Sequence, residues 1–332
     1  RCANPAPPTQ SSKSVGALST RRWARAVLLG EVNLPYQDQV AFFGNGHGDE
    51  LTMVFDFVAM QQMYLSLARA DSGPLTEALR ARPEIPRDCQ WATFVRNHDE
   101  LTLDKLTDAE REEVFAAFGP SEDLQLFGRG LRRRLPPMLD GDPRRLKMGY
   151  SLLFALPGTP TLFYGEEIGM GENLDREGRL AVRTPMQWTD GPNGGFSEAR
   201  PSRLFAPVTG GGYAPEHVNA RDQRRDPDSL LNHVTTLVRT YRECPELGWC
   251  DAEVLETDVP AVIALRSAVD DRVMITVHNL GADPVTVHLT IPDDATWLRG
   301  VIGNGDLEVD GRGRVEVVLD GYGYRWLRVS ST

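Results

Sequence analysis

A short segment of the sequence places several chemically active side chains just after an apolar run. Residues 94–104 read FVRNHDELTLD, in which Asn97, His98, Asp99 and Glu100 follow the apolar residues after a single arginine. A carboxylate and an imidazole can exchange protons with a ligand, and an amide can hydrogen-bond to its hydroxyl groups. This grouping is typical of an active site rather than of a purely structural strand.

Carboxylates also follow other apolar runs. Four runs are short and continuous, as expected of strands buried on both faces: 26–30, 51–57, 91–95 and 161–165. Glu31 follows the first run, Asp99 and Glu100 the third, and Glu166 and Glu167 the fourth. In parallel α/β barrels the reactive residues lie just beyond the C-terminal ends of the strands. Carboxylates after three of the four runs favour a sugar site, where paired carboxylates perform acid and base catalysis.

A carboxylate at the end of a single strand is most simply a solvated loop residue or a helix cap. We expect Glu166 and Glu167 to belong to this structural class and to order the loop after the last strand. The assignment of chemistry to the other carboxylates depends on three of the strand ends carrying them on one rim.

Helical segments separate the apolar runs. Thr107 and Glu110 form a capping box that opens a helix, which Gly119-Pro120 ends. Asp142-Pro143 opens a second helix, and residues 228–244 form a third that Pro245 stops. Strands that alternate with helices imply βα units and a parallel sheet, so the fold class is α/β.

The chain divides into three parts by composition. Residues 1–22 are rich in Pro and Ser and predict a disordered or atypical N-terminal segment. Residues 23–248 carry the βα pattern. Residues 249–332 contain short β-type runs separated by Gly, Asp and Pro, which predict a small antiparallel all-β domain, a sandwich, at the C-terminus.

Composition excludes several partners. The net charge of -11 argues against nucleic-acid binding, which needs clustered Lys and Arg. The basic run at 128–135 (GRGLRRRL) is therefore expected to be a solvated helix or surface loop. No apolar run is long enough to cross a membrane. The four cysteines are unpaired in spacing, so we expect no metal site, and they weakly favour a cytoplasmic setting: Cys2, Cys89, Cys244 and Cys250.

Several motifs in order resemble a known clan of enzymes. LLGEVN, FVRNHDE, LPGTPTLFYGEEIGMG and VRTPMQW look like the second half of the α-amylase clan of glycoside hydrolases. RNHDELTLD, and GENLDREGRLAVRTPMQWT followed by NGGFS, resemble trehalose synthases (maltose α-D-glucosyltransferases) most closely. The resemblance runs from about Trp23 to the C-terminus. It implies strands 5–8 of a TIM (β/α)8 barrel followed by the antiparallel domain, and a small-molecule sugar substrate.

The resemblance implies roles for four residues. Glu31 would be the general acid/base, which protonates the glycosidic oxygen and later deprotonates the acceptor. Asp99 would bind sugar hydroxyls and stabilise an oxocarbenium-like transition state. His98 would donate hydrogen bonds to the same sugar ring, and Asn97 would also contact substrate. The alternative for His98 alone is a satisfied core histidine.

The resemblance also implies a gate over a small pocket. In trehalose synthases two acidic residues after the NHD triplet and the arginine of RTPMQW close it, and the matching residues here are Glu100, Asp104 and Arg183. The family usually has Glu where this chain has Asp104, which shortens the reach to Arg183. Such a gate would keep water away while released glucose rotates and is glycosylated again. For Arg183 the alternative is an ordinary surface ion pair.

One expected carboxylate has no match in this sequence. A retaining mechanism needs a nucleophilic Asp, which the family carries in a segment like G-F-R-x-D-A some forty residues before the acid/base. Only thirty residues precede Glu31 and none match, so we expect the nucleophile to be absent from this chain. The first four strands and the subdomain that holds the family's calcium would be absent too, as from a truncated gene or partial sequence. No cofactor is expected here, and unpaired sheet edges make an oligomer possible.

Three functions remain open from the sequence. The first is a trehalose synthase-like isomerisation of maltose, with this chain inactive alone. The second is an α-glucosidase or oligo-1,6-glucosidase type of hydrolase, because RTPMQW occurs there as well. The third is a non-catalytic remnant that binds sugar or a partner chain.

Overall fold

The central element is a four-stranded parallel sheet in a computed structural model that describes residues 26–44, 48–292 and 294–331. Its strands run in the order β1 (Leu29–Gly30), β2 (Met53–Phe55), β3 (Gln90–Phe94) and β7 (Thr159–Thr161). Among the described residues, β1 and β7 each pair on one side only, and Leu29 of β1 is 46% exposed. The N-terminal segment 1–22 that we expect to be disordered lies outside the described residues.

Three of the four predicted strands are shorter than their apolar runs, and β1 covers only residues 29–30 of the run 26–30. The run 51–57 continues beyond the strand because Asp56 caps the next helix, where its carboxylate accepts a hydrogen bond from the Ala59 amide at 2.9 Å. The run 161–165 contributes only its first residue to β7, and the remainder forms a turn. Apolar composition marked the right places, but the helix cap and the turn set the ends.

Helices alternate with these strands, as the sequence predicts. Their bounds are α2 (Tyr36–Gln39), α3 (Phe57–Arg69), α4 (Gly73–Arg80), α5 (Asp108–Phe118), α6 (Leu135–Met138), α7 (Pro143–Ala155), α8 (Ala220–Gln223), α9 (Leu230–Glu243) and α10 (Pro245–Gly248). The capping box of Thr107 and the start at Asp142-Pro143 are confirmed. Ser229, rather than Asp228, caps α9, since its hydroxyl accepts a hydrogen bond from the Asn232 amide. No described helix is long and apolar enough to span a bilayer.

The basic run at 128–135 is not the solvated segment that its composition predicts. Leu131 is buried in β6 (Gly130–Leu131), which joins β4 (Leu101–Thr102) and β5 (Gln125–Leu126) in a small antiparallel sheet. Arg134 is only 2% exposed. Its guanidinium donates to backbone carbonyls of distant segments, which replace the water that a surface arginine would bind.

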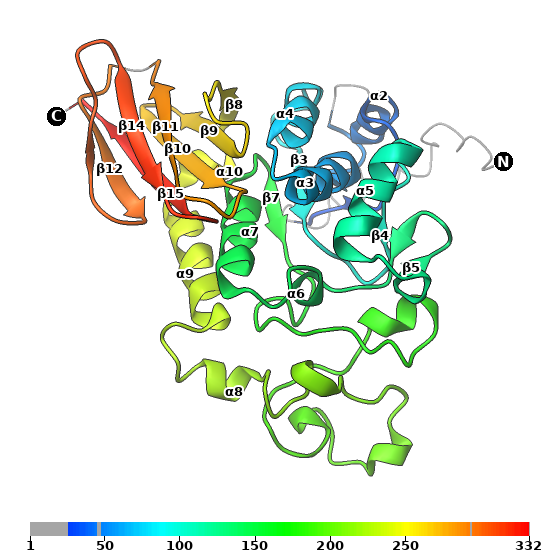
Figure 1. Ribbon diagram of the computed structural model, residues 1–332. Coiled ribbons are helices and arrows are strands. Elements are labelled where there is room, and N and C mark those ends of the chain that lie inside the picture. The colour runs from blue at the N-terminus through cyan, green and yellow to red at the C-terminus, as the bar shows by residue number, and fades with distance from the viewer. Residues whose placement is uncertain (1–25, 45–47, 293, 332) are drawn as a thin grey trace.

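The C-terminal region is antiparallel throughout. A six-stranded sheet has the order β13 (Leu307–Glu308), β12 (Trp297–Ile302), β15 (Tyr324–Ser330), β10 (Arg272–Asn279), β9 (Val262–Val269) and β8 (Asp251–Leu255). A second sheet pairs β11 (Val285–Thr290) with β14 (Arg314–Leu319). Alternating burial along β14 shows one face packed and one solvated. Figure 1 shows these strands beside α7 and α9, while the segment around α8 extends away from the parallel sheet.

A buried polar contact joins the two parts of the chain. The Ser151 hydroxyl of α7 lies 3.0 Å from Nε2 of His278 in β10 and accepts a hydrogen bond from Nε1 of Trp326 in β15 at 3.0 Å. All three side chains are fully buried. Burial lowers the pKa of His278 to about 3, so this imidazole is neutral in the folded protein.

The neutral His278 makes stability pH-dependent in a stated direction. Its folded pKa lies below its unfolded value, so its contribution is complete above about pH 6.5 and is lost as the pH falls below that value. Between pH 7 and pH 5 the wild type should lose on the order of 2 kcal/mol more unfolding free energy than His278→Gln. Urea unfolding at both pH values measures this. The exposed control His217→Gln should behave as wild type, and equal pH dependence in all three proteins would contradict the assignment.

Candidate active site

Three of the predicted site residues lie together at the C-terminal edge of the parallel sheet. Glu31 follows β1, while His98 and Asp99 follow β3, and β2 separates these strands. One polar atom from each side chain lies within 4.8 Å of the other two. Glu31 and His98 are exposed, and Asp99 is half-buried. Glu31 and His98 are 67 positions apart in sequence. They lie close together because β1 and β3 run parallel, so their C-terminal ends are at the same edge of the sheet.

The chemistry of this cluster follows from its groups. Two carboxylates and an imidazole at this spacing can exchange protons with a ligand and bind its hydroxyl groups. They are also the described His, Cys, Asp and Glu residues close enough to hold a metal ion. Exposed acidic groups commonly lie this close without one, so the geometry alone does not assign a metal.

Asp99 is held by two arginines. Nη2 of Arg183 pairs with one carboxylate oxygen, and Nη1 of Arg179 lies 2.8 Å from the other. Nε of Arg183 also donates to the backbone carbonyl of His98 at 2.6 Å. The amide oxygen of Asn97 accepts from the Asp99 backbone N–H at 3.0 Å, which tightens the turn after β3. The carboxylate therefore has a fixed orientation, and Asn97 orders the loop that carries it.

The structure does not bring the three expected gate residues together. Arg183 pairs with Asp99 and donates to the His98 carbonyl, and among the described residues it makes no ion pair or hydrogen bond with Glu100 or Asp104. The Glu100 side chain is 3% exposed and accepts from Nε of Arg179 at 2.5 Å. Asp104 accepts instead from Nδ2 of Asn33 at 2.9 Å.

Asp104 has its own local network. Burial alone would raise the pKa of this carboxyl, but hydrogen bonds from Asn33 and Lys105 outweigh burial and hold the pKa below its usual value. Asn33 comes two residues after Glu31, so Asp104 ties the loop that carries Glu31 to the loop after β3. Its observed position is that of a linker between two site loops.

Arg179 belongs to this network, and its position was not predicted from the sequence. It bridges Asp99 and Glu100, and its bond to Glu100 raises its own pKa. It lies in the short 3-10 helix Gly178–Val182, directly before Arg183. Two arginines four residues apart in GRLAVR were the available signal, since such spacing places side chains near one another in a helical turn.

Two buried arginines fix the loops behind this network. Nη2 of Arg96 donates to the Asp99 carbonyl at 2.6 Å. Arg134 donates to the Val182 carbonyl at 2.8 Å and to the Tyr164 carbonyl at 2.9 Å. Burial lowers the pKa of both guanidinium groups. The backbone positions of Asp99 and Arg183 therefore rest on two internal hydrogen-bond donors.

Glu166 lies among these buried groups. Burial raises its pKa to about 8, and one of its oxygens accepts from the Phe163 amide at 2.7 Å. This bond closes the turn after β7, as a structural residue would. Glu167 instead lines a neighbouring pocket.

That pocket is largely apolar and aromatic. Its volume is about 550 Å³, and Arg183 lies on its wall. The exposed rings of Tyr164, Trp188, Phe196 and Phe205 surround it. Aromatic faces beside a charged group suit a ligand with both apolar and hydroxyl-bearing surfaces, such as a sugar ring.

Comparison with known proteins bears on the family and the fold. Residues 133–248 match the family model of the α-amylase catalytic domain, and residues 272–328 match that of a sucrose hydrolase-like C-terminal domain. Residues 133–248 thus belong to the α-amylase family. The predicted resemblance and the fold class, a partial barrel followed by an antiparallel domain, are both confirmed.

Curated relatives in this family include trehalose synthases. The chain is 35% identical over 313 residues to trehalose synthase/amylase TreS of Mycobacterium tuberculosis, with 92% of this chain and 52% of the relative covered. It is 34% identical over 317 residues to a trehalose synthase of Pimelobacter, covering 92% and 55%. The chain thus spans about half the length of these curated relatives.

Solved structures show the same fold at low sequence identity. The α-amylase of H. orenii superposes with a TM-score of 0.71 at 18% identity, over 97% of this chain and 57% of that one. Isomaltulose synthase of Erwinia rhapontici gives 0.68 at 17%, over 97% and 58%. These likenesses establish the architecture.

The Arg179–Glu100 pair should be energetically coupled. Arg179→Gln leaves the buried Glu100 carboxylate with Arg129, at 3.5 Å, as its one remaining ion-pair partner among the described residues, so we expect a loss of about 1–3 kcal/mol of unfolding free energy. Glu100→Gln in the same chain should recover part of the loss, with a coupling energy above about 1 kcal/mol.

Denaturant unfolding of the two single variants and the double variant measures this coupling. The exposed Arg221–Asp190 pair is the matched control, and its coupling should stay below about 1 kcal/mol. Strictly additive losses at Arg179 and Glu100 would show that the buried pair does not act as a unit.

Proposed function

We propose that this chain supplies the acid/base side of the active site of a retaining, α-glucoside-active enzyme of trehalose synthase type. The reaction is the conversion of maltose to trehalose by glucosyl transfer within the site. The observation that carries the proposal is the meeting of Glu31, His98 and Asp99 at the strand ends. The sequence identity to trehalose synthases over most of this chain supports it.

Each residue of the cluster has one role in this proposal. Glu31 is exposed at the end of β1, where it can reach a glycosidic oxygen and deliver a proton to it. His98 is equally exposed and donates a hydrogen bond to a sugar hydroxyl. Asp99 places its carboxylate beside the anomeric centre, where negative charge stabilises the developing oxocarbenium ion.

Asp99 is poorly suited to be the nucleophile. A retaining pair needs its carboxyl groups about 5–5.5 Å apart, and one oxygen of Asp99 lies within 4.8 Å of one of Glu31. However, both oxygens of Asp99 are engaged by Arg179 and Arg183, which reduces their capacity to attack carbon. We therefore propose that the nucleophile comes from a segment outside this 332-residue chain, and that the chain alone turns over no maltose.

Water exclusion decides between transfer and hydrolysis. Isomerisation requires the cleaved glucose to remain in the site without competition from water. The aromatic pocket beside Arg183 would hold a glucosyl ring by stacking, and Glu100 would act on substrate through Arg179. Asp104 joins the loops of Glu31 and Asp99 and so contributes to closure.

One observation favours a second candidate, an α-glucosidase type of hydrolase. Glu31 and His98 are open to solvent in the described chain, and an open acid/base can direct water to the glucosyl intermediate. The same residues serve both reactions. The products therefore distinguish them.

The test is a product assay on the protein as its native gene encodes it, with maltose as substrate. We expect trehalose as the main product and glucose as the minor one. Glu31→Gln should lower kcat/KM about 10²–10⁴-fold, because a general acid contributes that much. The exposed control Glu112→Gln on α5 should keep wild-type activity.

Each other outcome rejects a specific statement. Glucose without trehalose would reject the isomerase and favour the hydrolase. No turnover by the native protein, with retained sugar binding, would identify a non-catalytic protein. Turnover by the 332-residue chain alone would show that the nucleophile lies within it.

A further inference from the structure

A second pocket lies away from the candidate active site and differs from it in charge. It has a volume of about 560 Å³ and is formed by Lys147 of α7, residues 224–228 and the first part of α9. Figure 1 shows α7 and α9 packed side by side, with the chain from α8 leading into α9. Four cationic side chains line it against the single carboxylate of Asp228: Lys147, Arg224, Arg225 and Arg239.

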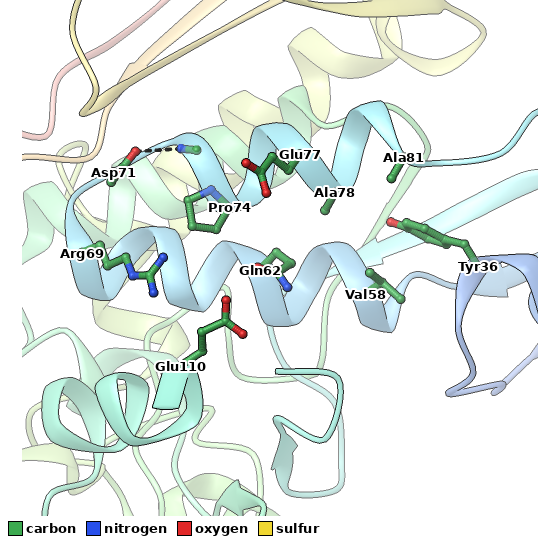
Figure 2. Close-up of a pocket in the computed structure, with 11 residues that line it drawn as sticks. Tyr36, Val58, Gln62, Arg69, Asp71, Pro74, Glu77, Ala78, Ala81 and Glu110 are labelled. Atoms are coloured by element: carbon green, nitrogen blue, oxygen red, sulfur yellow. Dashed lines mark hydrogen bonds between the residues drawn. The ribbon is translucent and has the colours of Figure 1, made fainter. Parts of the chain in front are cut away.

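This concentration of positive charge runs against the composition of the chain. The protein has 36 Lys and Arg against 47 Asp and Glu, so an average patch would be acidic. The pocket between α3 and α4 illustrates the contrast (Figure 2): there Arg69 faces Asp71, Glu77 and Glu110, and it is already paired with Glu113 at 2.7 Å. The cationic lining of the pocket beside α9 is thus not shared by the pocket between α3 and α4.

The cations of the basic pocket are available to a ligand. Among the described residues, no ion pair or side-chain hydrogen bond involves Arg224, Arg225 or Arg239; Arg225 only helps to lower the pKa of nearby Asp222. All three are exposed. Lys147 donates one hydrogen bond, to the Asp228 carbonyl at 2.8 Å, which leaves two of its three donors.

The donors of the threonine and asparagine side chains in the pocket are already engaged by backbone carbonyls. Thr235 and Thr236 donate to the carbonyls of Leu231 and Asn232. The Asn232 amide donates to the carbonyls of Gln223 and Asp226. The hydrogen-bond donors of the pocket that remain open to a ligand are therefore mainly those of its arginines and Lys147. Such donors favour an anionic ligand over a neutral sugar.

We propose that this pocket binds a phosphate group, either inorganic phosphate or the phosphate of a small sugar phosphate. Guanidinium groups match a phosphate in geometry and can each donate two parallel hydrogen bonds, while a lysine adds a point charge. The volume suits a small molecule. The site shares no residue with the Glu31–His98–Asp99 cluster. The phosphate-binding proposal therefore does not depend on the proposed glucosyl-transfer reaction.

The pocket adjoins the contact between the parallel-sheet region and the C-terminal strands. His233, on the wall of the pocket, has its ring 5.9 Å from that of Tyr324 in β15, and Tyr324 stacks on His278. A ligand that binds only the folded chain raises its melting temperature. Binding should therefore stabilise the protein as well as produce heat.

The test is isothermal titration of the 332-residue chain with inorganic phosphate, glucose 6-phosphate and glucose at constant ionic strength set by NaCl. We expect saturable binding at one site for the two phosphates and none for glucose. Affinity at least tenfold higher for glucose 6-phosphate would identify a sugar phosphate as ligand, and equal affinity would identify phosphate itself. No saturable binding of either phosphate would overturn the proposal.

Charge-matched variants make the site specific. The triple variant Arg224→Gln, Arg225→Gln, Arg239→Gln should weaken phosphate binding at least tenfold and abolish the rise in melting temperature. The control Arg200→Gln, Arg203→Gln, Arg272→Gln removes three exposed arginines elsewhere and should change affinity less than twofold. Equal weakening in both would show attraction by net charge alone. If the triple variant does not fold, Arg224→Gln and Arg239→Gln are measured singly and should each weaken binding severalfold.

Discussion

The guanidinium of Arg134 is the contact on which the candidate site depends most. It is buried and donates to the carbonyl of Val182, the residue before Arg183, and to the carbonyl of Tyr164 in the turn after β7. Its own backbone N–H donates to the Glu172 carboxylate at 2.9 Å. A buried charge is costly unless its hydrogen bonds are satisfied, so these segments are held where the donors require them. The hydrogen bonds from Arg134 to the Val182 carbonyl therefore fix the position of the loop that carries Arg179 and Arg183.

The charges of the site form a chain on that support. Arg134 sets the backbone before Arg183, Arg183 orients Asp99, and Arg179 joins Asp99 to the buried Glu100. Arg134 satisfies the carbonyl of the buried Val182, and Arg179 satisfies the buried carboxylate of Glu100. Asp99 is consequently rigid, which is what a group that stabilises a transition state by preorganised charge must be.

Sequence reasoning located the parts of this site that obey local rules. Glu31 and Asp99 follow apolar runs, and the strand-end rule needs only those runs and the residues after them. The start of α5 followed from a capping box within four residues. Arg134 could not be placed in this way, because its burial depends on carbonyls 30 and 48 residues away, and a basic run by itself predicts a surface. The resemblance predicted that Arg183 meets Glu100 and Asp104. In the described chain Glu100 pairs with Arg179, and Asp104 accepts a hydrogen bond from Asn33.

The two carboxylates of the cluster differ in how firmly the fold holds them. Asp99 has buried arginine bonds to its backbone and two guanidinium groups on its side chain. Glu31 follows β1, a two-residue strand that pairs only with β2 in the described structure. Hydrogen bonds between Leu28 and Thr52 are the main contacts that hold β1 in place. A short edge strand restrains its end less than an internal strand does. Glu31 is therefore the adaptable member of the pair. That is compatible with the proposed acid/base, which must first give a proton to one oxygen and then take one from another, and the firm hold on Asp99 is compatible with its proposed role of stabilising the transition state.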